Sequence, residues 1–332
     1  MTPDASDAAL VDGFGRQISY LRLSVTDRCD LRCGYCLPRG FKGGEAPGDW
    51  LSFAEIVRVV GAFTALGVRH VRLTGGEPLM RRGLPDLAAS LAALPGLDDL
   101  SISSNCTRMA AFAEPLRRAG VRRLNVSLDS LRPEVFRAIT GGRLAQVLVG
   151  IEAAREAGLA PIRVNTVVMR GVNDDEIEDI LAYCIARGFT LRLIETMPMG
   201  AGRLATPAHY LALEEVRRRL ARRFDLSPDL IQGGGPARYD RVADSETRIG
   251  FITPISRHFC ATCNRVRLAV DGTLHLCLGQ EGAYPLRALL RAGLDETELA
   301  THLRRAIALK PKRHLLRERP GQVGRSLSAI GG

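Results

Sequence analysis

The sequence predicts an α/β protein whose main part is an incomplete (βα)6 TIM-like barrel. Short β-branched runs alternate with helical segments between residues 18 and 224, and six of these runs can be identified as strands. Such alternation is typical of a parallel sheet covered by helices. The most unusual polar and glycine-rich residues of this region directly follow strands, and barrel enzymes build their sites at those strand ends.

The six predicted strands are short runs rich in Val, Ile and Leu, and each is bounded by turn-forming residues. The first connecting helix has clear ends, because Ser52 and Glu55 form a capping box and Gly67 follows the last apolar residue. A closed barrel of this type has eight units, so six units predict a barrel that is open on one side. The strands cover Tyr20–Val25, His70–Thr74, Leu100–Ser104, Arg123–Leu128, Ile162–Val168 and Thr190–Glu195.

Three regions follow from this pattern: an N-terminal extension (1–15), the barrel (16–225) and a C-terminal region (226–332). After the barrel, the segment PDLIQGGGPARYD is rich in Gly and Pro and indicates a linker; it lacks the GK[ST] ending of a phosphate-binding loop. Further on, two alternating runs flank Asp271-Gly272, which predicts a β-hairpin. This hairpin would bring Cys277 back toward Cys260 and Cys263.

Composition narrows the class of protein. The 332 residues are 46% hydrophobic, enough for a large core, and no apolar run reaches 18 residues. The N-terminus is acidic and polar, so we expect no signal peptide, no membrane partner and a cytoplasmic location. The net charge of +10 comes from 43 arginines and only three lysines, scattered over helical stretches, which favours solvated helix faces over a nucleic-acid surface.

Three cysteines, Cys29, Cys33 and Cys36, form a CxxxCxxC loop after the first strand. Electron-transfer iron-sulfur clusters normally take four cysteine ligands, so three ligands indicate a cluster with one iron open to a substrate or cofactor. A structural zinc site is the alternative, but it needs a fourth ligand, and residues 26–44 contain no further Cys and no His.

A second group, Cys260, Cys263 and Cys277, is also one ligand short. Zinc with His258 or His275 as the fourth ligand is the structural alternative. Arg265 and Arg267 follow at strand spacing, so both should point to one side of the strand and form a cationic patch beside the metal. A phosphate-bearing substrate could then bind the open iron while its charge meets the arginines. The remaining cysteines, Cys106 and Cys184, are expected to be ordinary buried side chains.

Several motifs together resemble one enzyme family. They are DGFGRQISYLRLSVTDRCDLRCGYC, VRLTGGEPLMRR, LNVSLDSL, GVND, CATCNRVRL and the final SAIGG. In this combination they resemble the GTP 3',8-cyclases of molybdenum cofactor biosynthesis, which are radical S-adenosylmethionine enzymes. The resemblance extends over almost the whole chain.

The resemblance implies two 4Fe-4S clusters, one on each cysteine group, and S-adenosylmethionine bound to the open iron of the first. Residues that would line the S-adenosylmethionine pocket are Tyr35, Gly76, Ser127 and Met197, although Gly76 could serve only as a turn and Met197 only as core. Residues that would hold GTP are Arg22, Arg72, Ser103, Arg163, Arg192, Arg265 and Arg267. The C-terminal tail, Gly331 and Gly332, would enter the active site, whereas a frayed end is the usual fate of such residues.

The implied reaction is a radical cyclisation of GTP. A 5'-deoxyadenosyl radical abstracts the C3' hydrogen of GTP, the C3' radical attacks guanine C8, and the product is 3',8-cyclo-7,8-dihydro-GTP. The resemblance further implies a reducing electron donor and transfer of the product to the cyclic pyranopterin monophosphate synthase, and it allows a homodimer. The second cluster would bind the guanine of GTP.

Four positions depart from the family pattern, and activity is expected to survive all of them. Arg163 stands for a lysine, Ser103 for a threonine, Cys106 for a glycine and Asp30 for an asparagine. Two rival interpretations stay open at this point. One is a peptide-modifying maturase of the same superfamily, and the other is an arginine-rich nucleic-acid-binding protein with structural zinc, whose affinity would fall steeply with salt.

Overall fold

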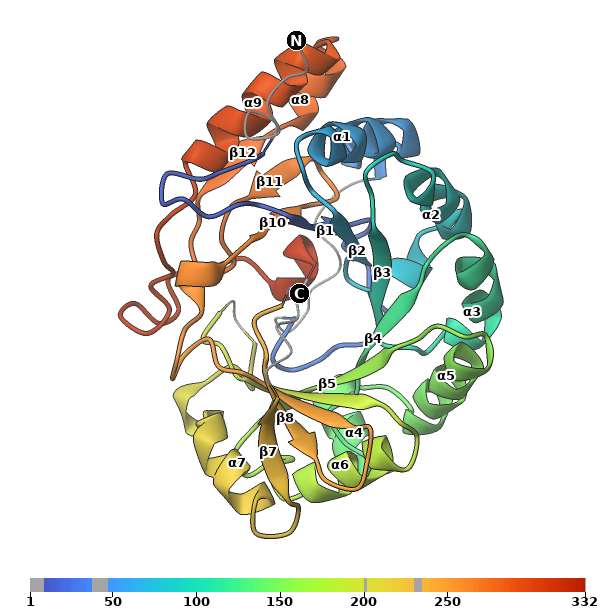
Figure 1. The fold of residues 1–332 in the computed structure, drawn as a ribbon, viewed down its shortest axis with the longest axis vertical. Coiled ribbons are helices and arrows are strands. Elements are labelled where there is room, and N and C mark those ends of the chain that lie inside the picture. The colour runs from blue at the N-terminus through green and yellow to red at the C-terminus, as the bar shows by residue number, and fades with distance from the viewer. Residues whose placement is uncertain (1–8, 38–46, 200–201, 230–234, 332) are drawn as a thin grey trace.

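One curved sheet of twelve strands forms the centre of the molecule, with helices along its outer side (Figure 1). The computed structural model describes residues 9–37, 47–199, 202–229 and 235–331. Within that part of the chain the strand order is β12-β11-β10-β1-β2-β3-β4-β5-β6-β9-β8-β7. The order has two free ends, so the barrel is open, and the predicted fold class is confirmed.

All six predicted strands are present, with bounds that differ by at most one residue at either end. They are β1 (Tyr20–Ser24), β2 (His70–Thr74), β3 (Asp99–Ser104), β4 (Arg123–Ser127), β5 (Ile162–Val168) and β6 (Thr190–Glu195). Each pairs in parallel with the next along the chain. Branched apolar residues on the outer face of these strands pack against the helices.

The C-terminal region extends this parallel sheet at both ends. Strand β10 pairs in parallel with β1, and β9 pairs in parallel with β6, so eight neighbouring strands are parallel. The hairpin at Asp271-Gly272 is confirmed: β10 and β11 pair antiparallel, and Gly272 has a φ of +83°. The strands are β7 (Leu226–Asp229), β8 (Arg238–Val242), β9 (Arg248–Ile252), β10 (Arg265–Leu268), β11 (Thr273–His275) and β12 (Ala283–Pro285).

Both ends of the segment PDLIQGGGPARYD, which was predicted to be a linker, belong to strands. Its first residues belong to the edge strand β7 and its last to β8, and these two strands pair antiparallel. The short β7 contains Pro228, which an edge strand tolerates but which hides the strand pattern in the sequence. The glycines Gly233 and Gly234 lie outside the described residues. The proposed boundaries at residues 16 and 226 stay predictions.

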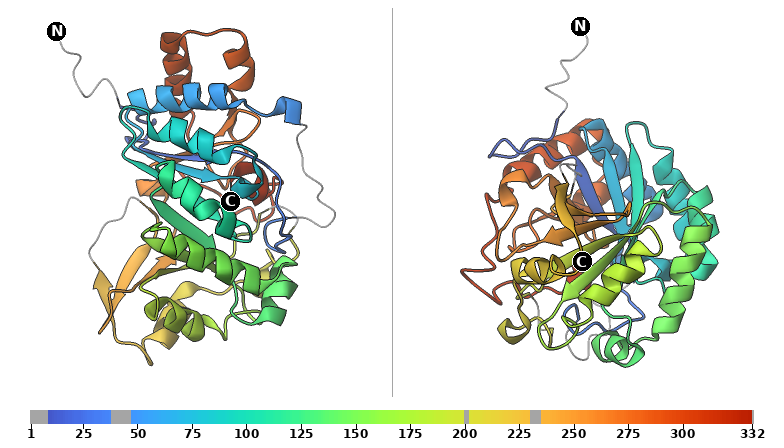
Figure 2. Two further views of the ribbon diagram at one scale, coloured as in Figure 1. Left: turned by 90° about the vertical axis from the view of Figure 1, so that its right-hand side faces the viewer. Right: turned by 60° about the horizontal axis from the view of Figure 1, so that its bottom comes forward.

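Helices cover the convex side of the sheet, and Figure 2 shows them as a layer around the strands. Helix α1 has the predicted capping box, with Ser52 and Glu55 bonded reciprocally. None of the helices in the described ranges has the length and apolarity needed to cross a membrane. The helices are α1 (Phe53–Ala65), α2 (Leu84–Ala92), α3 (Met109–Arg118), α4 (Pro133–Thr140), α5 (Leu144–Glu156), α6 (Ile177–Ile185), α7 (Leu213–Leu220), α8 (Arg287–Arg291) and α9 (Glu296–Ala308).

The end of the chain returns to the concave side of the sheet. A short 3-10 helix, η5 (Leu327–Ile330), is drawn in red near the middle of the ring of strands in Figure 1. Ile330 is 1% exposed and packs in a small apolar cluster with Met199, Leu316 and Val323. The last described residues are therefore held inside the open barrel.

Candidate active site

Arginines line the concave face of the sheet. The register places Arg22 of β1 level with Arg267 of β10 on one side and with Arg72 of β2 on the other. Successive strand residues point to opposite faces, and the neighbours Leu21 and Leu23 are fully buried in the core shared with the helices. The three arginines therefore face the interior of the barrel.

The same face continues across β3 to β6. It carries four more of the predicted site residues, joined by two asparagines that the sequence reasoning did not single out. One row across neighbouring strands contains Ser103, Asn125 and Arg163, and the next row toward the carboxyl ends contains Ser127, Asn165 and Arg192. The alternation of polar residues within each strand was the signal that could have found the asparagines.

The C-terminal tail reaches this arginine-lined face. Arg22 Nε and Arg267 Nη1 both donate to the Gly331 carbonyl, at 3.0 and 2.6 Å. Gly331 has a φ of +67°, and a Cβ at this position would lie 2.0 Å from Thr74 Oγ1. Only glycine fits both conditions. Gly332 lies outside the described residues.

In the described ranges, five of the arginines on this face form no ion pair with a carboxylate: Arg72, Arg163, Arg192, Arg265 and Arg267. Burial, reinforced by neighbouring arginines, lowers the pKa of Arg267 and of Arg163 to about 10, and it lowers the pKa of Arg22 well below its usual range. In the described part of the chain the Nε atoms of Arg72 and Arg265 are buried without a hydrogen-bond partner. Guanidinium groups keep their protons at neutral pH, so this face carries buried positive charge.

Aromatic rings hold several of these arginines in place. The guanidinium groups of Arg72 and Arg265 lie 5.4 and 5.6 Å from the centre of the Tyr20 ring. Arg192 Nε donates to Tyr239 Oη at 2.8 Å. Tyr239 comes from β8, which the sequence reasoning read as linker, so this positioning residue was missed.

The CxxxCxxC loop follows β1 and is pinned by the GGEP segment. Gly76 N donates to Thr26 O and Glu77 N to Arg28 O, both at 2.8 Å. A Cβ on Gly76 would lie 2.3 Å from Arg28 O. Gly76 is therefore required for close backbone contact with the cysteine loop, and its contact with S-adenosylmethionine stays a prediction.

A buried carboxylate organises the loop ends beside Cys29. Glu77 is 1% exposed and accepts hydrogen bonds from Ser104 Oγ at 2.8 Å and from the backbone of Asn105 at 2.7 Å. Burial raises the pKa of Glu77 to about 7. Asp30 accepts from Asn105 Nδ2 at 2.8 Å, so the departure from asparagine at this position is accommodated by a neighbouring donor.

Cys106 adopts the backbone conformation that the family pattern implies. Its φ is +63°, in the left-handed region that favours glycine. Its side chain is fully buried, as is that of Cys184. Both cysteines are therefore buried in the core, as predicted.

The residues mapped to S-adenosylmethionine lie at the carboxyl ends of the strands. Tyr35 donates to Asp129 Oδ2 at 2.8 Å, and burial raises the pKa of Asp129 to about 6. Ser127 ends β4 with its side chain exposed, and Met197 follows β6, packed against the cluster that contains Ile330. The tail and Met197 are therefore neighbours.

The second cysteine group lies at the opposite end of the strands. Cys260 and Cys263 precede β10, which runs parallel to β1, whereas Cys29 follows β1. Cys277 follows the antiparallel β11 and so returns to the same end as Cys263. This separation places the arginine-lined face between the two cysteine groups.

The thiols of the two cysteine groups are available as ligands for the two clusters. All eight cysteines are free. Burial raises the pKa of Cys29 and Cys36 to about 12; burial also raises that of Cys263, but Lys310 and Arg265 outweigh it and lower the value below the usual one. No three His, Cys, Asp or Glu side chains in the described ranges surround a single ion. A 4Fe-4S cluster needs a wider arrangement, because each thiolate binds a different iron.

The histidines suggested as zinc ligands have other surroundings. Burial lowers the pKa of His275 to about 4. His275 is the last residue of β11, and Cys277 lies two residues further along, beyond the end of that strand. The His258 ring packs edge-on against His314 with centroids 5.9 Å apart. Their positions give no support to the zinc alternative.

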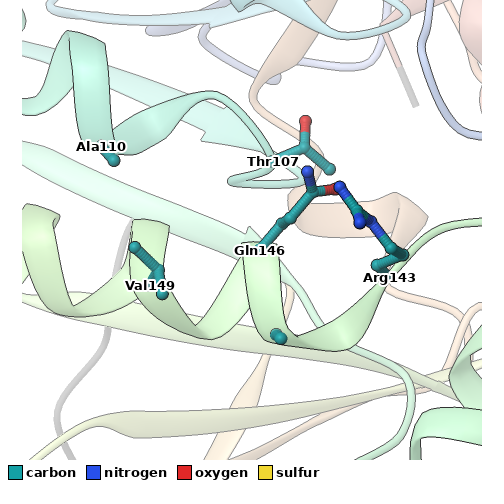
Figure 3. Close-up of a pocket in the computed structure, with 6 residues that line it drawn as sticks. Thr107, Ala110, Arg143, Gln146 and Val149 are labelled. Carbon is teal, nitrogen blue, oxygen red and sulfur yellow. The ribbon is translucent and has the colours of Figure 1, made fainter.

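A shallow hollow on the outer helices is separate from this interior site (Figure 3). It lies where the start of α3 faces the start of α5, and Val149 beside it is 61% exposed. Its lining offers one arginine and no carboxylate, thiol or imidazole, so it has no evident catalytic chemistry. The lining residues are Thr107, Ala110, Arg143, Ala145, Gln146 and Val149.

Comparison with known proteins agrees with this geometry. The profile of the Radical SAM superfamily matches residues 23–184, and that of Molybdenum Cofactor Synthesis C matches residues 189–316. The chain is 48% identical to GTP 3',8-cyclase 2 of Pseudomonas aeruginosa over 334 residues, covering 98% of this chain and 100% of that protein. The chain belongs to the GTP 3',8-cyclase family. A second member, from Paracoccus denitrificans, is 46% identical and covers 98% of this chain and 96% of its own.

The fold comparison is consistent with this family. The crystal structure of Streptococcus suis SuiB bound to S-adenosylmethionine matches with a TM-score of 0.62, covering 87% of this chain and 68% of that one at 16% identity. At that identity the match shows the fold alone. Membership of the GTP 3',8-cyclase family sets aside both rival interpretations, the peptide-modifying maturase and the nucleic-acid-binding protein.

Proposed function

We propose that this chain converts GTP to 3',8-cyclo-7,8-dihydro-GTP, the first step of molybdenum cofactor biosynthesis, by holding GTP between its two cysteine groups. The observation that carries this assignment of roles is the buried arginine-lined face. It has no carboxylate partner for Arg72, Arg163, Arg192, Arg265 or Arg267 in the described ranges. A triphosphate supplies the missing negative charge, and guanidinium groups bind phosphate oxygens in pairs.

The cofactors of the family are 4Fe-4S clusters and S-adenosylmethionine, which together supply the radical that removes hydrogen from the ribose. The residues that would hold the first cluster are Cys29, Cys33 and Cys36, and those for the second are Cys260, Cys263 and Cys277. Because the groups lie at opposite ends of the strands, a nucleotide bound across the arginines has its base near one end and its ribose exposed to the other.

The remaining residues hold the arginines in position and enclose the arginine-lined face. Tyr239 holds Arg192 through a 2.8 Å hydrogen bond, and Tyr20 supports Arg72 and Arg265. Gly331 closes the face beside Arg22 and excludes water from it. We propose the same roles for the S-adenosylmethionine residues Tyr35, Gly76, Ser127 and Met197 as the family resemblance implies.

Four further features of the proposal come from the sequence. They are the cytoplasmic location, a homodimer, a reducing electron donor, and delivery of the product to the cyclic pyranopterin monophosphate synthase. Grouped cysteines favour a reducing compartment, which supports the first. Gel filtration of the reconstituted protein measures the second.

Anaerobic reconstitution tests the proposed function. The protein should bind about eight irons per chain. With a strong reductant and S-adenosylmethionine, it should release 5'-deoxyadenosine in the presence of GTP and form the cyclised nucleotide. Protein that holds about eight irons and releases no 5'-deoxyadenosine with GTP would overturn the assignment.

A matched pair of variants tests the arginine-lined face directly. Arg267→Met removes a buried guanidinium from that face, and Arg305→Met removes an exposed one from α9. Loss of one charge-assisted contact of about 1.5–3 kcal/mol should weaken GTP binding by roughly tenfold to a hundredfold in the first variant only. Equal affinities for both variants would place the triphosphate elsewhere.

A further inference from the structure

A buried lysine ties together the two chain segments that carry the second cysteine group. Lys310 follows α9 and is 3% exposed. Its ammonium donates to the carbonyl of Arg265, at 2.9 Å, and to the carbonyl of Leu276. Arg265 stands two residues after Cys263, and Leu276 immediately precedes Cys277. One ammonium therefore bonds to both arms of the hairpin beside the cysteines.

The ammonium lies close to a thiol. Cys263 Sγ is 4.0 Å from the Arg265 carbonyl oxygen to which Lys310 Nζ donates. Their shared contact keeps the ammonium and the sulfur within about 7 Å of each other, a separation at which charges in a buried site still interact strongly.

Lys310 carries its charge without a carboxylate partner in the described ranges. Arg16 provides the contrast. It also grips this region, donating to Cys260 O and Pro311 O at 2.7 Å, but it is paired with Asp12 at 2.6 Å. A buried charge is costly unless an opposite charge compensates it. At Lys310 no carboxylate of the described ranges supplies that opposite charge, whereas a cluster on the neighbouring cysteines would.

The type of residue fits this requirement. The chain has 43 arginines and only three lysines, yet the residue at buried position 310 is a lysine. Its compact ammonium group can lie between two carbonyl oxygens. A 4Fe-4S cluster held by three thiolates has a net negative charge, and it becomes more negative on reduction. Nearby charge and hydrogen bonding are among the features that set cluster potentials.

We propose that Lys310 is the counter-charge of the second cluster and that it raises the reduction potential of this cluster above that of the same site without it. This inference rests on the proposed function, because it requires a cluster on Cys260, Cys263 and Cys277. Lys310 acts through the cluster and touches no substrate, so it is a positioning residue.

The test compares Lys310→Met with Lys312→Met in fully reconstituted protein. Lys312 is exposed, two residues along, and serves as the matched control. The measurement is the midpoint potential of each cluster by EPR-monitored redox titration without GTP. The second cluster is identified as the signal that persists when Cys29, Cys33 and Cys36 are all replaced by serine.

In Lys310→Met the ratio of reduced to oxidised second cluster at a fixed poise should fall about tenfold, a shift of about 59 mV to more negative potential. The first cluster and the Lys312→Met protein should be unchanged. Unchanged potentials in a Lys310→Met protein with full iron content would overturn the inference and leave Lys310 as a tether only.

A second variant covers failure to fold. Lys310→Gln keeps amide donors for the carbonyls but removes the charge, and the same negative shift is expected; an unchanged potential in this variant would overturn the inference. The two proposals fail differently. If the wild-type protein holds about eight irons and cyclises GTP, but the Lys310 variants have the same cluster potentials as the wild type, only the inference is overturned. If the wild-type protein holds only about four irons, on the first cysteine group, both the proposed function and the inference are overturned.

Discussion

A methyl group on Gly76 tests how the cysteine loop is held. In Gly76→Ala the new Cβ would lie 2.3 Å from Arg28 O and 2.6 Å from the Arg28 carbonyl carbon, where ordinary contacts begin at 3.4 Å. The loop backbone must therefore move by about 1 Å, which costs about 1–3 kcal/mol. The two 2.8 Å hydrogen bonds from Gly76 N and Glu77 N would weaken as well, at about 1 kcal/mol each.

Urea unfolding of the iron-free protein and iron analysis after reconstitution measure this effect. We expect the free energy of unfolding to fall by about 3–5 kcal/mol. We also expect iron to fall toward half, because Cys29 follows directly after the displaced Arg28 while the second cysteine group is undisturbed.

Gly61→Ala is the matched control, with the opposite expected sign. Gly61 lies inside α1, and its Cβ would meet only Leu94 Cδ2 at 3.7 Å. Alanine should stabilise the helix by about 0.5–1 kcal/mol and leave the iron content unchanged. A Gly76→Ala protein that matches this control in stability and iron would refute the claim that GGEP pins the cysteine loop.

Three other outcomes follow from contacts in the site. Tyr239→Phe removes the 2.8 Å hydrogen bond to Arg192 and should weaken GTP binding about threefold to tenfold, measured by calorimetry, with an unchanged circular dichroism spectrum. The pKa of Glu77 is raised from 4.5 to about 7 in the folded protein, so between these pH values the folded protein keeps a proton that the unfolded chain has lost. The free energy of unfolding should therefore fall by about 3 kcal/mol as pH rises from about 4.5 to 7. Glu77→Gln should flatten that slope, measured by urea unfolding at several pH values. Gly331→Ala should expel the tail, because its Cβ would lie 2.0 Å from Thr74 Oγ1, and hydrogen exchange at Ile330 should accelerate while the sheet stays protected; slow exchange at Ile330 in that variant would contradict the fit.

The six central strands could be predicted because each is a local run of β-branched residues with turn residues on both sides. Strands β7 and β9 were missed for local reasons: Pro228 interrupts the first, and Gly250 interrupts the second. The parallel pairing of β10 with β1 joins distant segments, and no short pattern encodes it. The hairpin was visible in Asp271-Gly272, but its place in the sheet was not.

The site shows the same division. Spacing identified both cysteine groups and placed Arg265 and Arg267 on one side of a strand, and the family resemblance supplied the other arginines. The buried groups that organise the site were not predicted, because Glu77, Asp129 and Lys310 are ordinary residue types whose burial depends on tertiary packing. Tyr239 was missed because it lies on a strand that the sequence did not reveal.

The hydrogen bond between Arg22 and Gly331 joins residues 309 positions apart. During synthesis the first strand leaves the ribosome long before β10 and Gly331, so the nucleotide site cannot assemble until these later segments have been made. A nascent or prematurely terminated chain exposes an unfinished row of positive charge and an unpaired strand edge. Radical chemistry therefore becomes possible only after the first strand and the distant Gly331 segment have met.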